Sequence, residues 1–225
     1  MHVGLVVGIG PAATDFYYRR LIATLAAAGA PLELTMAHAD TPTLLRNQAA
    51  GDPAAQVAIY RRLADRLEAA GASTIAITSI AGHFCIGEFI AVSPLPVIDL
   101  LAVVDGELVT RGLKRVGILG TRIAMETRFY GAATKTEIIP PQTSDALQAV
   151  HDAYVAMASS GSITQAQRDL FFSAGRALIR ESGAEAIMLG GTDLALAFDA
   201  THDPGFTTVD CAALHADAIA AAAMS

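Results

Sequence analysis

Two stretches of the sequence place hydroxyl, imidazole and carboxyl side chains directly after an apolar run of strand length. The first ends in Thr78-Ser79, with His83 four residues further on, and the second ends in Gly191-Thr192-Asp193. Parallel α/β folds bind ligands outside the carboxyl ends of their strands. A serine hydroxyl becomes a base or nucleophile when a neighbour takes its proton, so His83 could activate Ser79 if a turn joins them. We therefore predict acid–base or binding groups at both strand ends.

These two stretches occupy matching places in the chain. Gly8 and Ser79 are 71 residues apart, as are Gly120 and Gly191. An aspartate then follows Ser79 by 20 residues and Gly191 by 19. Equal spacing at these landmarks predicts two similar α/β halves that face one another across a cleft, with the two strand ends beside it.

Apolar runs of strand length alternate with stretches of helical length, which is typical of parallel sheets flanked by helices. The strands are expected at 3–7, 32–37, 74–78, 96–100, 116–119, 136–139, 186–189 and 207–210. Helices are expected after the turn Gly8-Ile9-Gly10-Pro11, from Gly51 through Leu67, up to Lys114, over 143–160 and 163–181, and at the C-terminus. The polar stretch His38 to Asn47 is long enough to be a functional loop.

The predicted fold class is therefore α/β, with two pseudo-symmetric halves that are each a mostly parallel sheet flanked by helices. The last strand and helix are expected to rejoin the first half. The predicted domains are 1–100 plus 206–225 for the first half and 101–205 for the second.

Composition narrows the function classes. The chain has 225 residues, of which 53% are hydrophobic, and a formal net charge of −7. Without a basic run, we expect no nucleic-acid and no anionic-membrane partner. No run approaches the length of a membrane span or resembles a signal peptide, so we expect a cytoplasmic protein. Cys85 and Cys211 have no spacing of a disulfide framework or a metal site, and we expect no metal.

The turn Gly8-Ile9-Gly10 gives two open readings. A lone Gly-x-Gly is weak support for a dinucleotide site, because the third glycine of that fingerprint is absent. Backbone N–H groups at the start of the following helix could instead hold a carboxylate.

Several partial motifs follow one another along nearly the whole chain. The segments are Gly8-Ile-Gly-Pro-Ala-Ala-Thr14-Asp-Phe-Tyr17, Gly117 to Glu126 followed by Phe129-Tyr130, Val150-His151, Gly190-Gly-Thr192-Asp193-Leu194 and Val209-Asp210-Cys-Ala-Ala-Leu-His215-Ala216. In this order they resemble the aspartate/glutamate racemase family. The resemblance implies an isomerase without cofactor or pyridoxal phosphate, a small carboxylate substrate and a homodimer.

The resemblance also implies a two-base reaction, in which one cysteine removes the α-proton and a second returns a proton to the other face. Here Ser79 stands at the first cysteine position and Gly191 at the second. A positioned thiol supplies a thiolate at neutral pH, whereas a serine hydroxyl needs a neighbouring base and glycine offers no acid or base. The chain is thus identified as a divergent member that lacks both usual catalytic cysteines.

Matching the family's motifs residue by residue gives the candidate site. The catalytic candidates are Ser79, Asp193, His83 and His215. The substrate-binding candidates are Thr14, Arg46, Thr78, Thr121, Arg122, Thr192 and Gly191. Arg46 stands where relatives place a clamp for a side-chain carboxylate, and it could equally be a surface arginine. The threonines could also be helix N-caps, Asp193 a capping residue and His215 a packed core histidine.

We predict a cofactor-independent racemase- or isomerase-like enzyme that acts at the α-carbon of a small carboxylate such as aspartate or glutamate. The alternative is a non-catalytic or altered-chemistry protein, similar to a lyase or decarboxylase, that binds a small dicarboxylate. Cys85 is expected to be a small buried hydrophobic residue. Cys211 could face the floor of the cleft.

Overall fold

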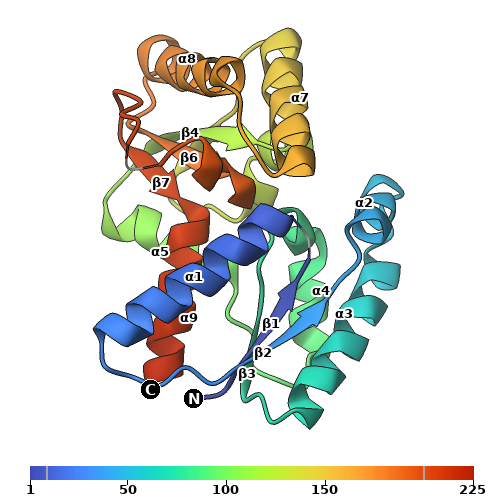
Figure 1. The fold of residues 1–225 in the computed structure, drawn as a ribbon. Coiled ribbons are helices and arrows are strands. Elements are labelled where there is room, and N and C mark those ends of the chain that lie inside the picture. The colour runs from blue at the N-terminus through green and yellow to red at the C-terminus, as the bar shows by residue number, and fades with distance from the viewer. Residues whose placement is uncertain (9, 200) are drawn as a thin grey trace. The chain divides into compact units, whose positions relative to one another are not determined.

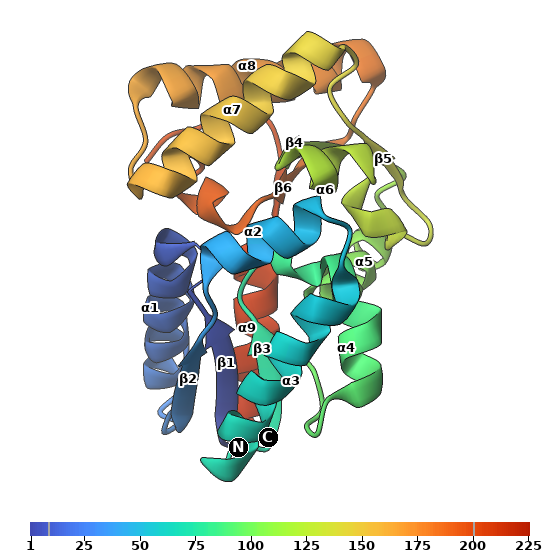
Figure 2. The same cartoon turned by 90° about the vertical axis from the view of Figure 1, so that its right-hand side faces the viewer.

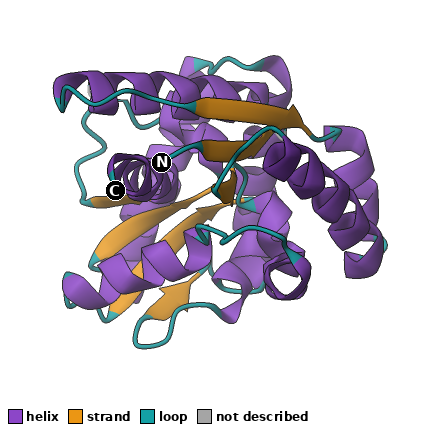
Figure 3. Ribbon diagram, turned by 90° about the horizontal axis from the view of Figure 1, so that it is seen from below, coloured by secondary structure: helices purple, strands orange, loops and turns teal. Residues whose placement is uncertain are grey.

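The computed structural model describes all residues except Ile9 and Ala200, and it divides the chain into two compact units (Figure 1). The first unit contains Met1–Leu100 and Ala213–Ser225, and the second contains Leu101–Ala212. Each unit has its own parallel sheet flanked by helices (Figure 3). The chain therefore has the predicted α/β class, with one sheet in each half.

The first sheet has the strand order β2-β1-β3, formed by β1 (Val3–Val7), β2 (Leu34–His38) and β3 (Thr74–Ile77). In the register, Val3 of the central strand pairs with Leu34 on one side and with Thr74 on the other. All five residues of β1 are buried, as expected for the central strand of a parallel sheet with both faces covered.

Helices cover both faces of this sheet. Figures 1 and 2 show α1 (Pro11–Ala27) and α9 (Cys211–Met224) on one side, and α3 (Pro53–Ala69) and α4 (Ile86–Val92) on the other. The shorter helix α2 (Thr41–Ala49) follows β2, and the 3₁₀ turn η1 (Ala81–Cys85) follows β3. The predicted starts of α1 and α3 are confirmed, and each of these helices has proline in its first turn, at Pro11 and Pro53.

The second sheet has the strand order β5-β4-β6-β7. Its strands are β4 (Arg115–Gly120), β5 (Glu137–Ile139), β6 (Ala186–Gly190) and β7 (Thr208–Asp210). The central pair ends in two glycines that face each other, since Gly120 pairs with Gly190. A Cβ at Gly120 would fall on the main chain of Gly190, so the close approach of these strand ends requires glycine.

Helices α7 (Ser144–Ser160) and α8 (Gln165–Ser182) pack side by side on this sheet (Figure 1). Thr164 caps α8, and Gln167 completes a capping box with it. The remaining elements are α5 (Leu100–Thr110), α6 (Arg122–Glu126), η2 (Phe129–Gly131) and η3 (Thr192–Leu196). In the described part of the chain, the helices are all too short or too polar to cross a membrane.

Four predictions about the elements need correction. Residues 96–100 are not a strand, because only Val97 pairs, through a single bridge to Ile75, and α5 already begins at Leu100. The predicted loop from His38 to Asn47 is mostly helix α2, because Asp40 caps it by accepting a hydrogen bond of 2.9 Å from the Thr43 amide.

The third correction concerns the domain boundary. Strand β7 pairs with β6, with Ile187 opposite Thr208, so the residues just after 206 lie in the second unit and not in the first as predicted. The chain returns to the first unit at Ala213, inside α9.

The fourth correction concerns the repeat. Val6 pairs with Ile77 and Leu119 pairs with Leu189. The number of residues along the chain between two paired residues is therefore one smaller in the second unit. Gly4 and Gly117 are then the equivalent glycines, because each pairs with an isoleucine, in β3 and in β6 respectively. Gly8 and Gly120 are not equivalent. Ser79 and Gly191 still occupy equivalent places.

Candidate active site

The carboxyl end of β3 carries Thr78 and Ser79, both buried. The Thr78 amide donates a hydrogen bond of 3.1 Å to the carbonyl of Val6 and extends the pairing of β3 with β1, and the Thr78 hydroxyl donates to the same carbonyl at 3.1 Å. The Ser79 hydroxyl accepts a hydrogen bond of 3.3 Å from the amide of Gly82 in η1. The turn after β3 therefore holds the Ser79 hydroxyl in place and leaves the oxygen able to donate its own proton.

His83 lies beside Ser79 but contacts its main chain. Its Nδ1 is 2.6 Å from the Ser79 carbonyl oxygen, which can only accept, so Nδ1 carries the hydrogen. Its Nε2 has no hydrogen-bond partner among the described residues and lies 3.9 Å from Oδ1 of Asp99. Burial lowers the pKa of His83, while the bond to Ser79 and the charge of Asp99 oppose that shift. The turn joins His83 to Ser79, through the backbone.

His215 is fully buried in the first unit, and both of its ring nitrogens are engaged. Nε2 donates to the carbonyl of Ile98 at 2.8 Å, so Nδ1 accepts from the Tyr17 hydroxyl at 3.0 Å. Burial lowers the pKa of His215 to about 3, and the nearby ring of His83 lowers it further in the same direction. His215 thus ties α9 to α1 and to the segment before Asp99 as a neutral ring.

Two binding candidates of the first unit have local partners. The Thr14 hydroxyl accepts from the Gly8 amide at 3.1 Å and donates to the Gly10 carbonyl at 3.2 Å, which closes the turn between β1 and α1. Ile9 of that turn lies outside the described residues. Arg46 is exposed on α2 and donates to the Thr43 hydroxyl at 2.8 Å.

At the carboxyl end of β4, Thr121 and Arg122 begin helix α6. The Thr121 hydroxyl accepts from the amide of Ala124 at 3.3 Å and so caps the helix, the second of its two expected roles. The Arg122 guanidinium donates to Glu126 at 2.6 Å and also to Gln148. Arg122 therefore has two partners within the unit, of which one is a carboxylate.

At the carboxyl end of β6, Gly191 leads into η3, where Thr192 and Asp193 are each only 3% exposed. The hydroxyl of Tyr154 donates a hydrogen bond of 3.0 Å to Oδ2 of Asp193. Burial and the charge of Asp193 raise the pKa of Tyr154 well above its usual value, so the phenol keeps its proton. Asp193 is thus paired with a phenol, a partner that the sequence did not predict.

Helix α7 supplies Tyr154 and also His151, which lie three residues apart and so share one helix face. His151 accepts at Nδ1 from the main-chain amide of Arg122 at 3.1 Å. Burial lowers the pKa of His151. Sequence reasoning singled out Val150-His151 only as part of a motif; the three-residue spacing to Tyr154 was the available sign that both lie on one face of α7.

The two cysteines are buried in packed surroundings. Burial, with a contribution from Glu88, raises the pKa of Cys85 to about 12. Burial and Asp210 raise the pKa of Cys211 well above its usual value. Among the described residues, no three His, Cys, Asp or Glu side chains are grouped so as to hold a metal ion.

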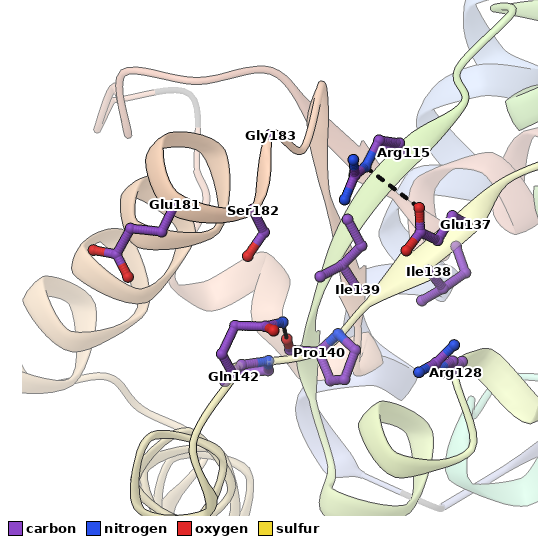
Figure 4. A pocket seen from close by; sticks show the side chains of 11 residues that line it. Arg115, Arg128, Glu137, Ile138, Ile139, Pro140, Gln142, Glu181, Ser182 and Gly183 are labelled. Atoms are coloured by element: carbon purple, nitrogen blue, oxygen red, sulfur yellow. Dashed lines mark hydrogen bonds and ion pairs between the residues drawn. The ribbon is translucent and has the colours of Figure 1, made fainter.

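A cavity of about 650 Å³ in the second unit does not include the predicted site residues (Figure 4). It lies at the start of β4, along the edge strand β5 and at the end of α8, where Arg115 and Glu137 form an ion pair of 3.3 Å. Arg115 begins β4 and Gly120 ends it, so this cavity is at the opposite end of the strand from Thr121.

A smaller cavity, of about 190 Å³, lies beside the carboxyl end of β2 in the first unit. Two arginines of α3, Arg62 and Arg66, line it together with His38, Asp40 and Thr43. Sequence reasoning missed these arginines, although their four-residue spacing puts both on one helix face. Arg46 does not line this cavity.

Comparison with known proteins agrees with this arrangement of elements. A model of the family Asp/Glu/hydantoin racemase matches residues 6–219. A crystal structure from Yersinia pestis, provisionally assigned as an Asp/Glu racemase, is 26% identical with a TM-score of 0.86 over 100% of both chains. An aspartate racemase homologue from Pyrococcus horikoshii is 21% identical with a TM-score of 0.82, over 100% of this chain and 99% of that one.

A glutamate racemase from Francisella tularensis, solved with D-glutamate, is 13% identical with a TM-score of 0.69, over 98% of this chain and 80% of that one. No curated protein sequence matches the chain. The family model covers nearly all residues from β1 to α9. The chain therefore belongs to the Asp/Glu/hydantoin racemase family.

Proposed function

We propose that this protein is a cofactor-independent enzyme of the racemase type that acts at the α-carbon of a small carboxylate such as aspartate or glutamate. The observation that carries the proposal is that buried polar side chains follow one strand of each sheet, Ser79 after β3, which pairs with β1, and Thr192-Asp193 after β6, which pairs with β4. Burying such groups costs free energy, so their presence at the ligand-binding ends of parallel sheets favours a chemical role.

In this proposal Ser79 is an acid–base group, because its hydroxyl is oriented by the Gly82 amide and keeps a proton to donate. His83 positions Ser79 by holding its carbonyl oxygen. Asp193 is an acid–base group of the second unit, and His215 keeps its neighbours in place. The proposed substrate contacts are Thr14, Arg46, Thr78, Thr121, Arg122, Thr192 and the main chain at Gly191.

A second candidate function is a non-catalytic binder of a small dicarboxylate, or an enzyme with lyase- or decarboxylase-like chemistry. The observation that favours it is the hydrogen bond from His83 Nδ1 to the carbonyl of Ser79. Because Nδ1 carries a hydrogen, it cannot accept the proton of the Ser79 hydroxyl as a base. We also propose a cytoplasmic homodimer, which sedimentation of the purified protein would test for assembly.

The experiment is proton NMR of the purified protein in deuterated water with each enantiomer of aspartate and glutamate. An enzyme of this type exchanges the α-hydrogen for deuterium, and Ser79→Ala should abolish that exchange for the enantiomer whose α-proton faces Ser79. Ser73→Ala is the matched control, because Ser73 is exposed at the other end of β3. Ser79→Cys should retain or increase exchange, because a thiol is the stronger acid.

A binder gives a different pattern. It would raise its melting temperature with a dicarboxylate and show no exchange in the native protein or in either Ser79 variant. Exchange of both enantiomers that persists in Ser79→Ala would move the acid–base group away from Ser79.

A further inference from the structure

The position of Gly191 is filled by a side chain from another helix. Gly191 has an extended backbone with φ of −158°, which any residue can adopt, so its conformation does not require glycine. A Cβ built there would lie 2.6 Å from Cζ and 2.9 Å from the hydroxyl oxygen of Tyr154. The Tyr154 ring thus stands where a side chain at 191 would begin, and its hydroxyl takes the place of that side chain's functional group.

The Tyr154 hydroxyl is itself part of a buried pair. It is 3.0 Å from Oδ2 of Asp193, and both side chains are at least nine-tenths buried, with Tyr154 7% and Asp193 3% exposed. A phenylalanine would fill the same space without burying a hydroxyl beside a carboxylate. An acidic pair of this kind is costly to bury for packing alone, which favours a role for the hydroxyl.

We propose, on the basis of the function proposed above, that the Tyr154–Asp193 pair is the proton-exchanging group of the second unit, with the phenol oxygen facing the substrate's α-carbon. The pair carries out the proton transfer that the family resemblance assigns to a thiol at position 191. Tyr154 is then a catalytic residue that comes from α7 and not from the strand end.

The proton step balances within the pair. The α C–H bond breaks and its electron pair stays on the α-carbon, delocalised into the substrate's carboxylate. The proton passes to the Tyr154 oxygen while the phenol's own proton passes to Oδ2 of Asp193. The phenol ends neutral and Asp193 becomes a carboxylic acid, so no buried phenolate forms. In the reverse step Asp193 returns a proton through Tyr154, and this proton is deuterium if Asp193 has exchanged with heavy water.

The test measures α-hydrogen exchange in deuterated water for the native protein, Tyr154→Phe and Asp193→Asn. Tyr154→Phe keeps the ring that fills the space at Gly191 and removes only the hydroxyl. For the enantiomer whose α-proton faces Tyr154, we expect each variant to lose about 100-fold or more of the exchange rate, the usual contribution of one acid–base group. Tyr18→Phe, on the exposed side of α1, is the matched control and should exchange at the native rate.

A second variant keeps the test valid if Asp193→Asn does not fold. Tyr154→Ala combined with Gly191→Cys empties the space and places a thiol in it, and it should exchange at least tenfold faster than Tyr154→Phe. Native-like exchange of both enantiomers in Tyr154→Phe would overturn the inference and leave the proposed function standing. No exchange in the native protein would end the proposed function, and the inference with it.

Discussion

His83 donates from Nδ1 to the main-chain carbonyl of Ser79 across 2.6 Å, and the Gly82 amide donates to the Ser79 hydroxyl across 3.3 Å. The two bonds close the turn between β3 and α4 around a single serine. His83 therefore acts on the backbone of Ser79, and its other nitrogen faces Asp99 at 3.9 Å. This geometry makes the imidazole a positioning group and leaves the hydroxyl free of it.

Replacing His83 should test that bond. His83→Leu leaves the buried Ser79 carbonyl unpaired and should lower the free energy of unfolding by about 1–3 kcal/mol. His83→Asn retains an N–H near the position of Nδ1 and should lose less, although it fills less volume. Urea unfolding of both variants is the measurement. If His83→Asn is the less stable of the two, the bond to Ser79 is not what His83 contributes.

Gly191 should tolerate no side chain while Tyr154 is present. Gly191→Ala places a Cβ against the Tyr154 ring and should cost about 1–3 kcal/mol of unfolding free energy. Gly106→Ala is the matched control, because Gly106 lies in α5 with open space around it and should become more stable by about 0.5–1 kcal/mol.

A double-mutant cycle assigns the cost to one contact. Tyr154→Ala alone leaves a cavity, and adding Gly191→Ala should then cost less than it does in the native protein, because the clash is gone. Additive effects would mean that the space at Gly191 is limited by something other than the tyrosine ring.

The sequence predicted the parts of the fold that depend on local patterns. Buried strands such as β1 and β6 are short apolar runs that end at a glycine, and Thr164 before α8 is a recognisable cap. Helix α2 was missed although Asp40, followed by Pro42 in the first turn, is also a capping pattern. In this stretch the polar composition predicted a loop, whereas the capping pattern indicates the helix that is present.

What could not be predicted depends on pairing between distant segments. The assignment of β7 to the second sheet rests on Ile187 facing Thr208, which no local pattern specifies. Tyr154 is the clearest case at the site, because it reaches Asp193 from a different helix. Motif matching identifies Gly191 as the position where the family's second cysteine is missing. The packed structure is needed to show that the Tyr154 ring fills the space at that position.

His215 should make stability fall in mildly acid solution. Its folded pKa of about 3 lies below the ordinary value of 6.5, so between these values the unfolded chain binds a proton that the folded protein does not. The stabilisation is complete above about pH 6.5 and is lost as the pH falls, at up to about 1.4 kcal/mol per pH unit. His83 is shifted in the same direction and adds to the slope.

Urea unfolding between pH 7 and pH 5 measures this slope, before most carboxylates titrate. His215→Gln cannot take up the proton, so its free energy of unfolding should fall less steeply with falling pH than that of the native protein. The difference in slope should be at most the contribution of one histidine. Equal slopes in the two proteins would show that His215 is already charged or exposed in the folded state.

Arg168 should hold the segment that follows η3. It is buried on α8 and donates from Nη1 to the Ala197 carbonyl and to Oδ2 of Asp199, each at 2.9 Å. Arg168→Met keeps the aliphatic stem but leaves the buried carbonyl unpaired, which should cost about 2 kcal/mol and speed amide hydrogen exchange at Ala197. Arg176→Met, exposed on the same helix, should change neither quantity. Unchanged exchange at Ala197 in Arg168→Met would remove this role.

Cys85 and Cys211 should be unreactive in the folded protein. Both are fully buried, and the pKa of each thiol is raised, to about 12 for Cys85, so the thiolate that attacks a disulfide reagent is scarce at pH 8. We expect no fast release of thionitrobenzoate from the native protein and two equivalents after unfolding in urea. A fast native reaction that disappears in Cys211→Ala would place that thiol at an open surface, and Cys211 would then compete with Ser79 and Tyr154 as an acid–base group.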